Sequence, residues 1–257
     1  AEVAPVEEAD CSFIPHVYLD MAIQNRYMSD GEIVNPHTMM MYTAGVAFDC
    51  GLYADIWVAQ DVNEYNKGSK IGKWDPEEID FTVGYGYTFE DVPVFKSLST
   101  DVNWSYWRYP HRSQFFGVGE TQKRIAVSVV SGLFLNPGLT VKWDYENSEV
   151  QIVPSISYSY DINDKLTAST KLEAFWFNKN WRYGRTAKHN KVRPFFYNGS
   201  GNGFATVVWS VALDYQINEN FSCGPFAKLG FDCNHATRAK WDGTDNHKSG
   251  VNNLVGF

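Results

Sequence analysis

Histidines are the first candidates for chemistry, because a histidine beside a serine is the usual base of nucleophilic catalysis. Such a pair needs the two side chains within hydrogen-bond reach and a third group that orients the histidine. Every histidine of this sequence falls in an expected loop or at an expected strand end, and none lies at mid-strand beside a serine: His16, His37, His111, His189, His235 and His247. We therefore predict that the chain is not an enzyme and has no catalytic residue.

One segment combines potential metal ligands. His235 and His247 share it with Asp242 and Asp245, and such side chains can bind a divalent ion. Their spacing matches no defined ligand signature, and a surface loop rich in Asp, Gly and Asn accounts for the same composition. We predict no metal site and no cofactor.

Charged residues also recur between apolar ones along the expected strands. If their face points into the lumen of a barrel, the interior is lined by Asp20, Arg26, Asp55, Asp80, Asp101, Arg124, Lys142, Lys171, Glu173, Asp214 and Lys228. In a barrel of about twelve strands, such side chains fill much of the interior. Two interpretations remain open: a constriction that selects small polar solutes by charge and size, or an ion-paired plug that conducts little.

A cluster of basic residues without any acidic one is unusual in a chain of net charge -8. It occupies the longest expected connection and could attract anionic solutes or bind lipopolysaccharide phosphates, for which arginine has suitable geometry. A solvated loop is the alternative. The cluster consists of Lys179, Arg182, Arg185, Lys188, Lys191 and Arg193.

Hydrophobicity with a period of two residues runs through the sequence and predicts the elements that position these side chains. In residues 79–89, for example, Ile, Phe, Val and Tyr alternate with Asp, Thr and Gly. Aromatic residues near strand ends on one face, with small or charged residues on the other, favour a transmembrane barrel over a soluble sandwich. The expected strands are 16–29, 38–50, 52–64, 77–89, 94–109, 121–135, 138–146, 150–162, 165–178, 205–217, 221–234 and 250–257.

The connections between these strands alternate in length, apart from a short link at 147–149. Short turns are expected at 50–51, 90–93, 136–137, 163–164 and 218–220, and long loops at 31–37, 65–76, 110–120, 180–204 and 235–249. This is the plan of outer-membrane barrels, which have short periplasmic turns and long external loops. The sequence therefore predicts an all-β fold: a closed, antiparallel, up-and-down transmembrane barrel of about twelve strands over 16–257, after a periplasmic segment at 1–15.

Composition agrees with this fold. No stretch approaches 18 uninterrupted apolar residues, so a closed barrel is the remaining way to span a bilayer. The first ten residues are small and acidic, as expected after signal-peptide removal and export to the bacterial outer membrane. Terminal Phe257 resembles the signal that the barrel assembly machinery recognises. The acidic net charge argues against nucleic-acid binding through the overall field.

The cysteines permit two disulfides in an oxidising periplasm, or some or all of them are free and buried. Their spacing does not decide the pairing of Cys11, Cys50, Cys223 and Cys233.

The sequence from His16 to Glu64, with HVYLDMAIQNRYMSDG and GVAFDCGLYADIWVAQDVN, followed by EIDFTVGYGYTF, resembles the TorF-type porins of Gram-negative bacteria. In that family the opening strand usually carries Tyr-x-Phe-Arg-Gly, where this chain has Asn25, Arg26, Tyr27 and Met28. The resemblance implies an outer-membrane channel without catalysis.

The leading functional hypothesis is a narrow, porin-like channel for small polar or anionic solutes. The alternative is a non-conducting barrel whose long external loops bind lipopolysaccharide or a surface partner. A lipid-acting barrel enzyme is disfavoured by the histidine positions, and a soluble all-β binding protein is the competing fold.

Overall fold

The computed structural model describes residues 14–29, 32–35, 37–62, 76–110, 120–146, 148–178, 202–233 and 251–257. Nearly all of them belong to antiparallel strands. The strands are β1 (Pro15–Gln24), β2 (Tyr27–Ser29), β3 (Glu32–Asn35), β4 (Met39–Phe48), β5 (Leu52–Asp61), β6 (Pro76–Val92), β7 (Lys96–Tyr109), β8 (Glu120–Ser131), β9 (Gly138–Asp144), β10 (Glu149–Asn163), β11 (Leu166–Phe177), β12 (Gly203–Asn218), β13 (Phe221–Cys223), β14 (Phe226–Asp232) and β15 (Val251–Gly256).

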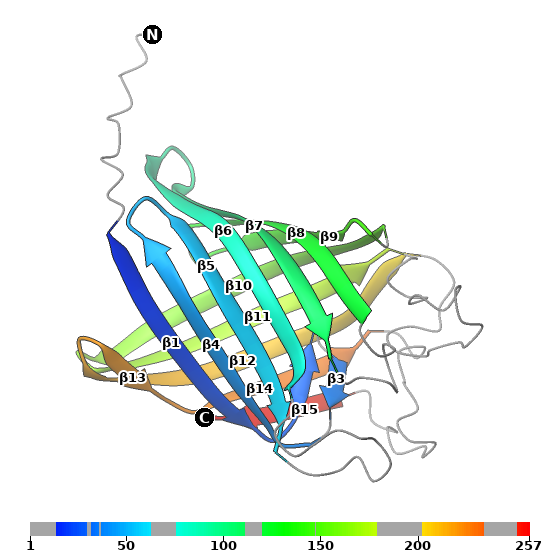
Figure 1. Cartoon of the computed structure of the whole chain (residues 1–257). Helices are drawn as coiled ribbons and strands as arrows, with labels where there is room; N and C mark the ends of the chain where they lie inside the picture. The colour runs from blue at the N-terminus through cyan, green and yellow to red at the C-terminus, as the bar shows by residue number, and fades with distance from the viewer. Residues whose placement is uncertain are drawn as a thin grey trace.

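These strands form a closed barrel (Figure 1). Each strand of the wall pairs with its neighbours in sequence order, the β11–β12 pairing joins the two ends of the sheet, and β1 pairs with β15. Because β13 and β14 both pair with β12, they form one interrupted strand of the wall. The wall therefore has twelve strands, which confirms the predicted all-β, closed antiparallel barrel and its strand count.

The interruption between β13 and β14 has a local cause. Proline has no backbone N–H, so Pro225 cannot donate to the ladder. At Gly224 an added Cβ would lie 1.6 Å from the carbonyl oxygen of Leu213, which leaves room only for glycine. The single strand predicted at 221–234 is therefore split at this Gly-Pro pair.

The two ends of the barrel differ in their connections. The turns after β4, β6, β8, β10 and β12 lie at one end, called here the turn end. At the opposite end, called the loop end, the strands are joined through longer stretches of sequence, except for the short β9–β10 link that the sequence also predicted. Figure 1 shows the β4–β5 and β6–β7 turns beside the start of β1.

The first strand was predicted too long, at 16–29. β1 ends at Gln24, and β2 leaves the wall to pair with β3 in a separate two-stranded sheet. The side chain of Asn25 caps this departure, because its Oδ1 accepts a hydrogen bond of 3.0 Å from the Val255 backbone N–H. The chain after Gln24 thus forms a hairpin at the loop end.

β1 and β15 share a short pairing. Ile23 and Phe257 exchange two backbone hydrogen bonds of 2.8 and 2.9 Å, and Gln24 is opposite Gly256. By contrast, β1 pairs with β4 along its whole length. Among the residues that the structure describes, no helix is long and apolar enough to cross a membrane.

Candidate functional site: the barrel lumen

Burial separates the two faces of the wall. Along β6, Phe81, Val83 and Tyr85 are between 45% and 50% exposed, whereas Asp80, which directly precedes Phe81, is 8% exposed. A charged side chain can be buried in a single-layered wall only by pointing into the barrel. Alternate residues therefore face the lumen, and the apolar set faces outward.

The cross-strand pairs place ten of the eleven predicted charged residues on the lumen face: Asp20, Asp55, Asp80, Asp101, Arg124, Lys142, Lys171, Glu173, Asp214 and Lys228. Arg26 is elsewhere. It is half-buried and donates a hydrogen bond of 3.1 Å to Oδ1 of Asn253. Asn253 is paired with the outward-facing Leu229 of β14. The structure thus places Arg26 where β1 meets β15.

Burial also changes along the lumen. On β10 the inward residues Glu149, Gln151 and Val153 are buried, Ser155 and Ser157 are half-buried, and Ser159 is exposed. β6 and β12 show the same gradient from the loop end to the turn end. We call the buried region next to the loop end the loop half of the lumen, and the less buried region next to the turn end the turn half. On β10 the loop half includes Glu149, Gln151 and Val153, and the turn half includes Ser157 and Ser159. The loop half is packed and the turn half is open.

The β2–β3 hairpin contributes to the packing of the loop half. Tyr27 is buried against Met39 and Ala59 of the β4–β5 wall, and its ring centroid lies 5.7 Å from that of Trp57. Met28, the next residue, is buried in an apolar cluster on other strands of the wall: Val153, Phe175, Phe177, Ala205, Val208 and Leu254. Because neighbouring residues in a strand point in opposite directions, β2 lies across the lumen between two parts of the wall.

The remaining sector of the loop half is polar. The guanidinium of Arg124 is stacked 3.6 Å from the ring centroid of Trp107 and donates a hydrogen bond of 2.8 Å to Gln122. Asp144, paired with Arg124 across β8 and β9, is fully buried. Asp80 lies close enough for the charge of Arg124 to act on it. In this sector, therefore, the described side chains form a closely packed polar region rather than a wide aqueous passage.

Tyrosine rings in the turn half lie over glycines to reach aspartates two strands away. Tyr18 of β1 passes over Gly45 and donates a hydrogen bond of 3.0 Å to Asp55. Tyr53 of β5 passes over Gly84 and donates a hydrogen bond of 2.9 Å to Asp101. The repeated arrangement fixes both carboxylates on the lumen wall.

Charge is distributed unequally around the lumen. From β1 to β7, the described charged residues of the lumen wall are acidic and include Asp20, Asp55, Asp80 and Asp101. From β8 to β14, cations stand among acids: Arg124, Lys142, Lys171 and Lys228. A solute in the turn half therefore lies between an acidic wall and a wall of mixed charge.

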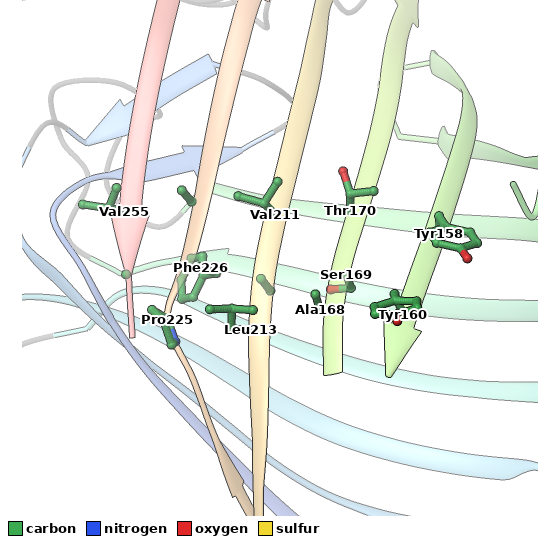
Figure 2. Close-up of a pocket in the computed structure, with 13 residues that line it drawn as sticks. Tyr158, Tyr160, Ala168, Ser169, Thr170, Val211, Leu213, Pro225, Phe226 and Val255 are labelled. Atoms are coloured by element: carbon green, nitrogen blue, oxygen red, sulfur yellow. The ribbon is translucent and has the colours of Figure 1, made fainter. Parts of the chain in front are cut away.

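An apolar groove of about 590 Å³ lies on the wall over β10, β11, β12, β14 and β15 (Figure 2). Tyr158 and Tyr160 lie at its β10 side and Val255 at its β15 side, with Leu213 between them. All four side chains are among the exposed, outward-facing ones. The groove thus belongs to the outer surface and is separate from the polar lumen.

Several predicted residues cannot be placed. The basic cluster at 179–193 and the possible metal ligands His235, Asp242, Asp245 and His247 lie outside the described residues. Of the two described histidines, His16 contacts Asp49 at 2.7 Å at the turn end, and His37 precedes β4. Within the described ranges, no three His, Cys, Asp or Glu residues are grouped so as to hold a metal ion.

A scan against protein-family models and a search among curated proteins both find no match for this sequence. The resemblance to TorF-type porins stays a prediction from the sequence pattern.

Proposed function

We propose that the chain is an outer-membrane barrel of a Gram-negative bacterium. The outward face supports this proposal, because a large continuous apolar surface is unfavourable in water. Exposed aliphatic and aromatic side chains are mixed on this face: Val83 is paired with Trp104, and Val102 with Tyr85. The other exposed aromatic residues include Trp143, Tyr87, Tyr158, Tyr160 and Tyr215. An outward face of this composition suits contact with lipid.

In the proposed orientation, the turn end faces the periplasm and the loop end faces the exterior, as in outer-membrane barrels generally. β11 ends and β12 begins at this external end. Binding of lipopolysaccharide phosphates by the Arg and Lys residues of the intervening sequence, 179–193, is part of the proposal. Phe257, at the end of β15, remains the proposed contact with the barrel assembly machinery.

Within this class, we propose a narrow channel for small polar solutes. The observation that carries the proposal is the open turn half, whose wall presents hydroxyl, carboxylate and ammonium groups to solvent. Such a wall can replace the hydration of a polar solute. The loop half and its hairpin set the size limit, so passage requires either a residual gap there or displacement of β2.

The packing of Tyr27 and Met28 favours a second candidate, a barrel that is closed to solutes. Apolar contacts on two parts of the wall are stabilising and exclude water. In that case the barrel is an anchor for its external loops.

Single-channel recording in planar bilayers distinguishes the two. We expect the wild-type barrel to give small, discrete events, and replacement of residues 27–35 by a Gly-Ser linker to increase the conductance, because the lumen is then less obstructed. A variant with Val211→Ala, on the outward face of β12, is the control and should conduct like the wild type. If the wild type is silent and the linker variant conducts, the barrel is a closed one and the channel proposal is wrong.

A further inference from the structure

We propose that the turn half of the lumen contains a binding site for a small monocarboxylate, built around Lys171 and Lys228. The proposal deepens the channel function, because it names a solute class, and it rests on a water-filled turn half.

The two lysines occupy one cross-strand row. Lys171 is paired with Ser157 of β10 on one side and with Ser210 of β12 on the other, and Ser210 is paired with Lys228 of β14. Neighbouring strands are about 4.8 Å apart, so the two lysine Cα atoms are separated by about 10 Å. Two long side chains at this separation can converge on one anion, with serine hydroxyls between them as further donors.

The charges around the two lysines favour a ligand with one negative charge. Nζ of Lys171 lies 2.7 Å from Oε1 of Glu173, so one positive charge is already balanced. Lys228 is half-buried and is influenced by the charges of both Glu173 and Lys171. Within the described part of the chain, no hydrogen bond or ion pair engages its ammonium. Two lysines and one glutamate leave one net positive charge, which matches a monoanion.

Packed apolar side chains lie beside the row. Leu254, opposite Lys228 on β15, is 1% exposed and belongs to the apolar cluster with Val208 and Phe175. Because these side chains are already covered by one another, they close this side of the site and leave the lysine and serine groups as its contacts.

The opposite wall helps to confine the anion. Asp55 and Asp101, held by Tyr18 and Tyr53, carry charges that repel a carboxylate. Attraction on one side and repulsion on the other favour the row of lysines over the rest of the lumen.

Benzoate and its uncharged analogue benzamide test the site by calorimetric titration of the full chain in non-ionic detergent at low ionic strength. We expect benzoate to bind about tenfold more tightly than benzamide, because hydrogen bonds from an ammonium group to a carboxylate are stronger than those to a neutral amide. Lys228→Met should weaken benzoate binding by about tenfold for the same reason. Lys142→Met, which removes a lumen lysine outside the row, is the matched control and should leave the affinity unchanged.

Glu173→Gln gives a result of opposite sign. It removes the carboxylate that competes for Lys171, so benzoate should bind several-fold more tightly, and this gain can be measured even if Lys228→Met fails to fold. The proposed site would be overturned by equal affinity for benzoate and benzamide, or by an unchanged affinity in a folded Lys228→Met barrel. It would also be overturned if Lys142→Met lost as much affinity as Lys228→Met, or if Glu173→Gln gained none. Because binding is measured in detergent, its failure is distinguishable from an absence of conductance.

Discussion

Gln151 and Ser159 lie on the same strand and both face the lumen, yet Gln151 is fully buried and Ser159 is exposed. The loop half around Gln151 is packed by a hairpin and by aromatic side chains, whereas the turn half around Ser159 is lined by small polar residues. Packed interiors lose stability when volume is removed, and open ones do not. The barrel therefore combines a closed, stabilising part with an open part that can interact with solutes.

Truncation of a lumen side chain should lower the free energy of unfolding much more in the loop half than in the turn half. Phe177 of β11 is 1% exposed in the apolar cluster of the loop half. We expect Phe177→Ala to lower the free energy of unfolding by about 3 to 5 kcal/mol because it leaves a cavity. Ser169→Ala, on the lumen face of the same strand in the turn half, should change it by less than about 0.5 kcal/mol.

Urea unfolding of the barrel in lipid bilayers measures both variants. Similar losses in the two would contradict a packed loop half beside an open turn half.

A smaller effect tests whether the turn half is ordered as well as open. A Cβ at Gly84 would lie 2.4 Å from the Tyr53 ring, so Gly84→Ala must displace the tyrosine that holds Asp101. We expect a loss of about 1 to 3 kcal/mol from this overpacking. At Gly86, the nearest atoms are 3.7 Å from the added carbon, so Gly86→Ala is the control with little overpacking.

The same unfolding assay compares the free energies of unfolding of the Gly84→Ala and Gly86→Ala variants. If Gly84→Ala and Gly86→Ala have equal effects, the tyrosine does not occupy the space above Gly84.

The sequence was sufficient for the fold because its period of two residues survives along whole strands. It separates Phe81 and Val83 from Asp80 and Thr82 without any knowledge of neighbouring strands, and the short and long connections then predict the up-and-down order. The break at Pro225 also had a signal, because proline within an expected central strand argues against a continuous ladder.

The hairpin had only a weak signal. The apolar positions Val17 to Ile23 are followed in phase by the polar Asn25, and Met28 is apolar in the opposite phase. This loss of alternation indicates where β1 ends but does not reveal that the chain turns into the lumen. Burial of the loop half and the contact of Tyr53 with Asp101 depend on cross-strand register, which a single sequence does not specify. For the same reason, Arg26 was predicted in the lumen with its neighbours on β1, although it lies beside Asn253.

Accessibility along β10 tests the central claim of two unlike lumen halves most directly. In a variant whose native cysteines are replaced by serine, single cysteines are introduced at 151, 153, 155, 157 and 159, and their reaction rates with a charged, membrane-impermeant thiol reagent are compared. Fast reaction is expected at 157 and 159, with a steep fall toward 153 and 151, because those side chains are buried. Similar rates at all five positions would contradict the closure of the loop half.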